Sequence, residues 1–389
     1  MAEPPGTTRI GATHPDRDWI RRVRGALDSW EAAAPATPTS QVFGGGAIAA
    51  AEEAFSLLLD GRPTLLLPSA TYALRVGLQV VGVRPGNEVL CGSIDWPSGF
   101  AAIASLGAVP VAVAMDPATL TLDPAAAAKA RTRRTRAVIA CHLHGICADI
   151  PALRSLLPGV GILEDAAQAF GGRLDGLPAA SLGDVAVFSL GPGKPIDAGE
   201  GGVLVCGDSG TYRAALAVAC HPLRQLLAGI SDADPRALAM RPHPMTAVLA
   251  LDALARWSPE TAERAYARTR RLLAADGRLR PLGHDSRHSI TSGYVPVLLP
   301  DDHEPAEADS LEPPPGVCWT RSGAQLLPSV RDSDQETAAR LLARVRLAAL
   351  RDLAATDDDD HDPASIPGRP SSGASIGGFP LDSVAQEHR

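Results

Sequence analysis

The sequence contains almost no lysine. Only two of its 36 basic residues, Lys129 and Lys194, are lysines, and the others are arginines. The chain therefore uses arginine wherever it needs a positive charge. A primary amine can lose its proton and form an imine, which a guanidinium cannot do. A position that keeps lysine is for this reason a candidate for chemistry.

Long apolar runs and an excess of positive charge are also missing. No run approaches the roughly 20 apolar residues that cross a bilayer, and the N-terminal stretch lacks the apolar segment of a secretory signal. The net charge is −8, from 36 basic and 44 acidic residues. We therefore expect neither nucleic acid nor a membrane as partner, and we predict a soluble, cytoplasmic protein.

The six cysteines form no C-x-x-C pair. Scattered cysteines in apolar runs are typical of reduced core residues, so neither a disulfide framework nor a metal site is predicted. The 37 glycines and 34 prolines among 389 residues stay below the roughly 25–30% that marks low-complexity disorder. The length is ample for a buried core and gives a prior of two to three domains.

Short apolar runs alternate with helical stretches over the first part of the chain. Candidate strands are 64–67, 88–91, 109–114, 137–141, 159–163, 184–188 and 203–206, with helices such as 71–81, 98–106 and 150–157 between them. Strand and helix repeated in this way predict a mostly parallel sheet with helices on both faces. The predicted class is α/β.

The pattern changes near residue 246. Helices are predicted over 246–257 and 259–275, strands over 293–298 and 316–320, a surface loop over 300–315 and a long helix over 334–353. The predicted organisation is a disordered tail (1–15), a large α/β domain with an N-terminal helix (16–245), a small α+β domain (246–354) and a disordered acidic, Gly/Ser-rich tail (355–389).

Lys194 stands in the segment FSLGPGKPIDAGEGGVLV, with glycines on both sides. Small residues around it would let a bulky group approach the backbone closely. A surface lysine on a flexible loop explains the same segment equally well.

Glu164 and Asp165 end the apolar strand GVGILED. In parallel α/β sheets, ligands bind beyond the carboxyl ends of the strands. A carboxylate there can keep a pyridine nitrogen protonated, as pyridoxal phosphate requires to act as an electron sink. An Asp that caps the next helix is the plainer interpretation.

Further groups suited to such a cofactor follow other strands. Ser69 and Thr71 in LLLPSATYAL bring hydroxyls and free backbone N–H groups to a helix start, which is an anion site. Trp96 in CGSIDWPSGF could stack on a flat ring, and Ser189 adds a hydroxyl just before Lys194. Each feature also has an ordinary structural explanation, but together they are the parts of a pyridoxal phosphate site.

Several segments resemble the DegT/DnrJ/EryC1/StrS family. The most specific part of the resemblance is ILEDAAQAFGG (162–172), followed by FSL (188–190) and KPIDAGEGGVLV (194–205). PSATYAL (68–74) and ACHLHGICADIPAL (140–153) add to it. The family consists of pyridoxal phosphate-dependent aminotransferases of fold type I, many of which make amino sugars. The resemblance runs from about residue 41 to 257.

The resemblance implies roles for individual residues. Lys194 matches the lysine that forms the imine with the cofactor and shuttles the proton. Asp165 matches the partner of the pyridine nitrogen, Gln168 the amide beside the ring, and Trp96 the aromatic stacked on it. The phosphate group would be held by Ser69, Ala70, Thr71 and Ser189. The resemblance also implies a homodimer whose sites are shared across the interface.

The sequence departs from the family in places. The family's His-Leu-Tyr-Gly is His142-Leu143-His144-Gly145 here; in a strand, these two histidines would share a face, yet without further ligands they predict no metal site. The asparagine that commonly reaches the partner subunit's cofactor phosphate is Ala239. Beyond residue 257 the family's substrate segment is not recognisable.

The predicted function is transamination from an amino acid donor, expected to be glutamate, to a keto-sugar or related ketone in amino-sugar or antibiotic biosynthesis. Two alternatives remain open. The chain could catalyse another pyridoxal phosphate reaction on an amino acid or natural-product intermediate, or it could be a non-catalytic regulatory paralogue.

Overall fold

The computed structural model describes residues 17–32, 43–235, 237–276, 280–282, 287–292, 295–298, 317–321, 325–326 and 345–350. By its internal contacts the chain divides into two units, 1–351 and 352–389, and every described residue belongs to the first. None of the helices described is both long and apolar enough to cross a membrane.

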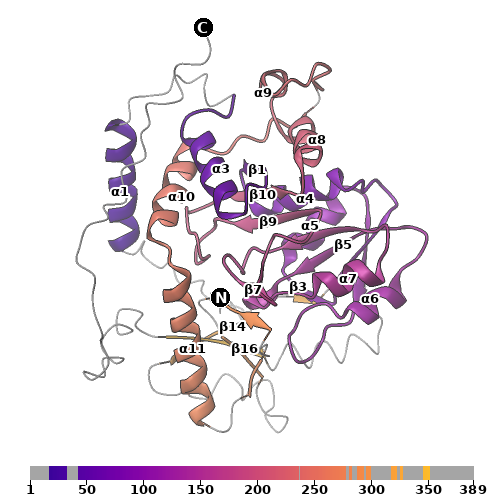
Figure 1. Ribbon diagram of the computed structural model, residues 1–389, viewed down its shortest axis with the longest axis vertical. Coiled ribbons are helices and arrows are strands. Elements are labelled where there is room, and N and C mark those ends of the chain that lie inside the picture. Colours follow the sequence, from indigo (N-terminus) through magenta and orange to yellow (C-terminus); the bar gives the residue numbers. More distant parts are fainter. Residues whose placement is uncertain are drawn as a thin grey trace, which may run out of the picture. The chain divides into compact units, whose positions relative to one another are not determined.

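The largest sheet has seven strands in the order β1-β10-β9-β6-β5-β2-β4 (Figure 1). The strands are β1 (Thr64–Leu67), β2 (Glu88–Gly92), β4 (Val109–Val113), β5 (Thr135–Cys141), β6 (Gly161–Asp165), β9 (Val185–Ser189) and β10 (Gly202–Cys206). β10 runs antiparallel to both of its neighbours, and the pairs from β9 to β4 are parallel.

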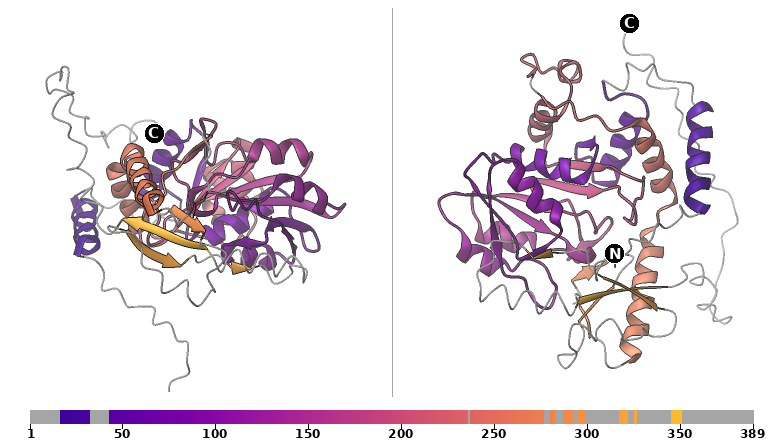
Figure 2. Two further views of the ribbon diagram at one scale, coloured as in Figure 1. Left: turned by 90° about the horizontal axis from the view of Figure 1, so that it is seen from below. Right: turned by 180° about the vertical axis from the view of Figure 1, so that it is seen from behind.

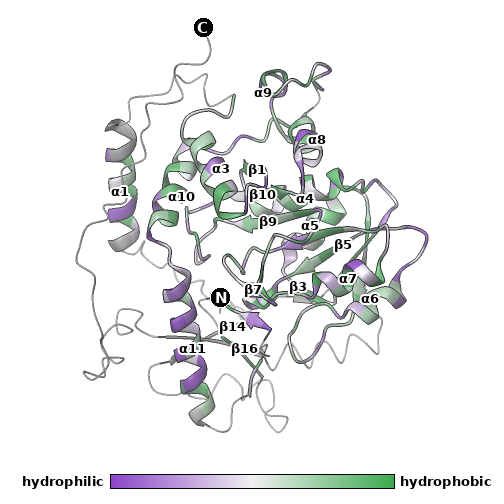
Figure 3. Ribbon diagram, in the orientation of Figure 1, coloured by the Kyte–Doolittle hydropathy of each residue, from purple (hydrophilic) through white to green (hydrophobic). Residues whose placement is uncertain are grey.

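Helices cover both faces of this sheet. One face packs against α4 (Ala70–Val80), α5 (Pro97–Ser105) and α8 (Ser209–Ala219), which is followed by α9 (Pro222–Leu227). The other face packs against α3 (Ala47–Leu58), α10 (Pro244–Arg256), α6 (Pro124–Ala130) and α7 (Ile150–Leu156), and α1 (Arg17–Ala32) packs on α10. Strands that are buried on both faces are apolar along their whole length. Figure 3 shows the central strands of this sheet mostly in the green of hydrophobic residues.

Close packing positions the start of α4. Ser69 caps the helix by accepting a hydrogen bond from Tyr72 N at 3.3 Å. Within the helix, a Cβ on Gly77 would come within 2.8 Å of Leu163 Cδ1, so glycine lets α4 lie close against the sheet. The first turn of α4 is thereby held at the edge where β1 ends.

A four-stranded antiparallel sheet, β11-β13-β16-β14, lies beside α11 (Pro259–Asp276) (Figure 2). Its strands are β11 (Arg280–Pro281), β13 (Val295–Leu298), β14 (Val317–Arg321) and β16 (Val345–Leu350). Two smaller sheets join distant segments: β12 (His288–Ser289) with β7 (Arg173–Leu174) and β8 (Leu177–Pro178), and β3 (Ile94–Asp95) with β15 (Gln325–Leu326).

The α/β class and the mostly parallel sheet are confirmed. The helix predicted over 334–353 is wrong where it is described, because β16 is a strand between β13 and β14. Alanine, leucine and arginine favour a helix locally, and pairing with two neighbouring strands overrides that preference. The predicted loop (300–315) and both predicted tails lie outside the described residues, and the boundary at 245/246 stays a prediction.

Candidate active site

The residues predicted to form the site meet at one edge of the seven-stranded sheet. β6 ends there at Asp165, β9 ends at Ser189, and β1 leads into α4. Because β10 is antiparallel, its first residue, Gly202, lies at the same edge, paired with Ser189 and Leu67. This is the edge beyond which parallel α/β sheets bind their ligands.

Lys194 lies in the loop between β9 and β10 and faces Trp96, the residue before α5. Its Nζ is 4.9 Å from the centroid of the Trp96 ring, a distance at which a cation is attracted to the π-face. Burial lowers the pKa of Lys194, and charges on Asp165 and Cys141 only partly oppose this. A lysine with a lowered pKa holds more free amine, the form that attacks a carbonyl.

Asp197 organises the Lys194 loop, although the sequence analysis did not single it out. Its carboxylate accepts hydrogen bonds from Gly193 N at 3.1 Å and from Gly199 N at 2.9 Å. Arg22 of α1 donates to the Asp197 carbonyl at 2.5 Å. An Asp among glycines is a common turn former, and this was the signal available in the sequence.

Asp165 is buried beside the end of β5. It pairs in register with Cys141, and its Oδ1 accepts a hydrogen bond from Ala167 N at 3.1 Å. Burial raises the pKa of Asp165, while the Ala167 N–H and the positive charge of Lys194 favour its ionised form. The carboxylate and the amine of Lys194 therefore stabilise each other's charged states.

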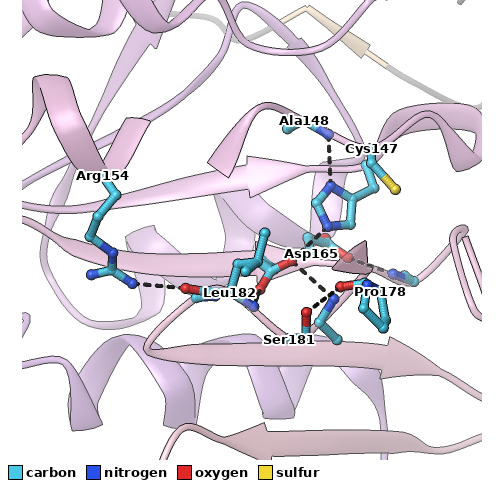
Figure 4. A network of polar contacts seen from close by, with 12 residues as sticks. Cys147, Ala148, Arg154, Asp165, Pro178, Ser181 and Leu182 are labelled. Atoms are coloured by element: carbon cyan, nitrogen blue, oxygen red, sulfur yellow. Dashed lines mark hydrogen bonds and ion pairs between the residues drawn. The ribbon is translucent and has the colours of Figure 1, made fainter. Parts of the chain in front are cut away.

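Strand alternation directs Glu164, the residue before Asp165, to the opposite face of the sheet, where it belongs to a buried network. Figure 4 shows this network around Ala148, Leu182 and Asp165. Its carboxylate accepts from Ala180 N at 2.9 Å, from Leu182 N at 2.8 Å and from Gly183 N. His142 Nδ1 accepts from Ala148 N at 3.0 Å, so Nε2 carries the proton that it donates to Glu164 Oε2, 3.0 Å away. The network holds the end of β6, and with it Asp165, in place.

We expect Glu164→Gln to lower the free energy of unfolding by about 2–3 kcal/mol, because its amide NH₂ would face buried N–H donors. Burial raises the pKa of Glu164, but hydrogen bonds from His142 and the backbone outweigh it, so the pKa lies below 4.5. The stabilisation is therefore present above pH 4.5 and lost as the pH falls through the folded pKa. Urea unfolding at pH 7 and pH 3.5 measures this.

The exposed Glu53 of α3 gives the matched control. Glu53→Gln should change stability by less than about 0.5 kcal/mol. Equal stability of Glu164→Gln and the wild type at pH 7 would contradict the network.

The two histidines of the His-Leu-His-Gly segment do not share a strand face. They lie in the short 3₁₀ turn η1 (Leu143–Gly145) and at its cap, where His144 has a φ of 58°. Burial lowers the pKa of His144 to about 4, so its ring is neutral at physiological pH. The sequence suggested a strand because the apolar run of β5 leads directly into this turn.

Gln168 supports the same turn. Its Oε1 accepts a hydrogen bond from His144 N at 2.8 Å. With the oxygen engaged, the amide NH₂ is the part of this side chain that can donate to a bound molecule. The predicted place of Gln168 beside a cofactor ring stays a prediction.

The start of α4 forms a cradle that depends on Gly202. A Cβ on Gly202 would lie 2.5 Å from both Ala70 N and Ser69 C, which real side chains cannot do. Thr71 Oγ1 donates to Ser98 Oγ at 3.0 Å and so links the starts of α4 and α5. Ser189, opposite Gly202, accepts from Gly191 N at 3.3 Å. The hydroxyls of Thr71 and Ser189 and the N-terminus of α4 thus form a site suited to binding an anion.

A search against protein families matches residues 28–309 to the DegT/DnrJ/EryC1/StrS aminotransferase family. The chain is 34% identical over 266 residues to 3-amino-5-hydroxybenzoate synthase of Amycolatopsis mediterranei, which covers 66% of this chain and 67% of that protein. It is 40% identical over 139 residues to L-glutamine:2-deoxy-scyllo-inosose aminotransferase of Streptoalloteichus tenebrarius, which covers 35% of this chain and 33% of that protein.

The fold is also similar to solved structures. The crystal structure of 3-amino-5-hydroxybenzoic acid synthase superposes with a TM-score of 0.70 at 26% identity, covering 85% of this chain and 90% of that one. The similarity thus extends beyond the sheet. The match to the inosose aminotransferase spans only about a third of that protein.

Proposed function

Because this chain belongs to the DegT/DnrJ/EryC1/StrS aminotransferase family, we propose that it is a pyridoxal phosphate-dependent aminotransferase that transfers an amino group from an amino acid to a cyclic or sugar ketone. The observation that carries the proposal is the position of Lys194. One of only two lysines in the chain lies half-buried over Trp96 and within the electrostatic reach of Asp165.

The described residues fit this cofactor. The cradle at Gly202, with Ser69, Ala70, Thr71 and Ser189, suits the phosphate group, and the buried carboxyl group of Asp165 at the end of β6 suits the ring nitrogen. Trp96 offers a flat face for the ring, Gln168 an amide donor, and Lys194 the amine that binds the aldehyde carbon. When bound, pyridoxal phosphate supplies an electron sink for the carbon that loses a proton.

The chain's own residues would then move and hold the protons. Lys194 Nζ, with its lowered pKa, takes the proton from the α-carbon of the amino donor. The same amine returns a proton at the carbon of the acceptor that becomes aminated. Asp165, whose ionised form is favoured by the Ala167 N–H, would hold the proton on the ring nitrogen.

The substrate classes follow from the relatives' names. Those names specify L-glutamine as donor and a cyclic inosose as acceptor in one case and an aminohydroxybenzoate product in the other. We propose glutamine or glutamate as donor and a polyhydroxylated cyclic ketone as acceptor, in the biosynthesis of a specialised metabolite. A location in the cytoplasm stays a prediction.

We also propose a homodimer. The connection between α8 and α10 exposes Leu223, Leu226, Leu227 and Leu238, with 71% of Leu227 accessible. Leu223, Leu226 and Leu227 recur at helical spacing in α9, and contiguous exposed apolar patches mark protein–protein interaction sites. A second copy of this chain is the partner that the family resemblance implies.

Ala239 provides a test of that interface. Its φ is +46°, a left-handed conformation that alanine adopts at a cost and that asparagine tolerates. We expect Ala239→Asn to raise the free energy of unfolding by about 0.5–1 kcal/mol and to tighten pyridoxal phosphate binding in the dimer. Urea unfolding of the apo-protein and titration of the cofactor measure the two effects.

The neighbouring Leu238→Asn controls for a new amide without the left-handed backbone. It should not stabilise the protein. If Ala239→Asn stabilises the protein but leaves cofactor affinity unchanged, the interpretation that this segment reaches the partner's phosphate site is wrong.

The experiment that tests the proposed function is the donor half-reaction. The purified protein is incubated with pyridoxal phosphate and then with glutamine or glutamate, and both cofactor and amino acid are analysed by mass spectrometry. Formation of pyridoxamine phosphate with a 2-oxo acid supports transamination. An altered amino acid without an aminated cofactor supports a different reaction, and no reaction of the bound cofactor with any donor supports the non-catalytic alternative.

A further inference from the structure

A second buried carboxyl group lies at the same edge of the sheet, and the proposed function does not use it. Asp95 ends the short strand β3, which follows β2, and only 2% of the residue is exposed. Strands β6, β5 and β2 are neighbours in the sheet. Asp165 ends β6 and Cys141 ends β5 at this edge, and Asp95 lies just past the end of β2.

The contacts of Asp95 connect two parts of the proposed site. Its Oδ1 accepts a hydrogen bond from the backbone N–H of Trp96 at 2.7 Å, and its carboxylate is hydrogen-bonded to the Cys141 thiol. Cys141 is the register partner of Asp165. Trp96 in turn faces Lys194. The Asp95 side chain therefore contacts the backbone of Trp96 on one side and Cys141, the register partner of Asp165, on the other.

The charge of this group is coupled to the site. Burial and the charge of Asp165 raise the pKa of Asp95 to about 7, against the opposing hydrogen bonds from Cys141, Trp96 N and Gly92 N. Burial raises the pKa of the Cys91 thiol in β2, and the charge of Asp95 raises it further. Two carboxyl groups that share a buried region disfavour each other's ionised form.

Burial raises the pKa of Asp165, and the Ala167 N–H and the positive charge of Lys194 oppose this by favouring its ionised form. Asp165 and Asp95 therefore lie in one buried region, where the charge of Asp165 disfavours the ionised form of Asp95. A change at Asp95 would then alter the potential at Asp165, Cys141 and Lys194 together.

We propose that Asp95 is a positioning residue of the cofactor site, which fixes Trp96 opposite Lys194 and sets, next to Cys141, the charge that surrounds Asp165. The inference rests on the proposed function, because it assigns a role toward the same cofactor. It makes Asp95 a residue that tunes the pH range of the site without touching the reacting atoms.

Two substitutions separate the two roles. Asp95→Asn keeps an oxygen for Trp96 N–H and removes the charge, whereas Asp95→Leu removes both. We expect Asp95→Asn to bind pyridoxal phosphate and to quench tryptophan fluorescence as the wild type does. Its cofactor absorbance should titrate about one pH unit lower, because the positive charges of the site lose a negative neighbour. In Asp95→Leu the quenching should also weaken.

The apo-protein gives a readout that needs no cofactor. Because the folded pKa of Asp95 is raised from 3.8 to about 7, its stabilising contribution is present below pH 3.8 and is lost as the pH rises through 7. The urea midpoint of the wild type should therefore fall relative to that of Asp95→Asn between pH 4 and 7. In Asp95→Asn/Asp165→Asn the two effects should be non-additive.

Asp123→Asn is the matched control, because Asp123 caps α6 and asparagine caps a helix equally well. It should leave both titrations unchanged. Identical cofactor and unfolding titrations in the wild type and Asp95→Asn would overturn the proposal. If instead the wild type shows no lysine-dependent cofactor band, the proposed function fails, and the apo-protein titration still decides whether Asp95 and Asp165 are coupled.

Discussion

Replacing Lys194 with alanine should abolish the near-visible absorbance that the protein acquires with pyridoxal phosphate. It should lower the rate of the donor half-reaction by about 10²–10⁴-fold, the contribution of a positioned acid–base group. The reason is the primary amine, which lies opposite Trp96 with a pKa lowered by burial. Borohydride reduction followed by peptide mass spectrometry should find the cofactor on Lys194 in the wild type alone.

Two further variants make this result specific. Lys194→Arg keeps a positive charge for Trp96 and Asp165 but cannot form an imine, so it should be as inactive as alanine. Lys129, the chain's other lysine, is exposed in the last turn of α6, and Lys129→Ala should behave as the wild type. Borohydride labelling of Lys129, or a band that survives in Lys194→Ala, would refute the assignment.

The sequence predicted the strands of the large sheet well because their signal is local. Runs such as Thr64–Leu67 and the strand ending at Asp165 are buried on both faces and therefore apolar throughout. The direction of β10 and the strand β16 depend on pairing between distant segments, which local composition does not encode. A helix was predicted at Val345–Leu350 for this reason.

The same distinction holds for the site. Lys194, Asp165 and Trp96 could be proposed from motifs, since each follows a recognisable strand. Asp95 could not, because its importance comes from its contact with the Trp96 N–H. For Asp197 the sequence offers only the general signal of a turn, and its bonds to Gly193 N and Gly199 N show its role. Glu164 and Asp165 are adjacent in sequence, yet strand alternation directs them to opposite faces of the sheet and gives them different tasks.

Asp165→Asn should have opposite effects on activity and stability. Asparagine has nearly the same shape but no charge, so it cannot hold a proton on the ring nitrogen. We expect the half-reaction to slow by about 10²–10³-fold, the size observed when one electrostatic stabiliser is removed from an active site. Stopped-flow absorbance with the saturated donor measures this rate, and cofactor titration shows whether binding is retained.

The stability of the apo-protein should move the other way. Burial raises the pKa of Asp165 above 3.8, so ionising the folded protein costs free energy as the pH rises through that pKa. Asp165→Asn should therefore be at least as stable as the wild type at pH 8, with the difference shrinking toward pH 3.5. A variant that loses activity and stability together would instead show that Asp165 serves the fold. If Asp165→Asn is more stable than the wild type but slower in the donor half-reaction, the carboxylate of Asp165 is retained for catalysis at a cost in stability.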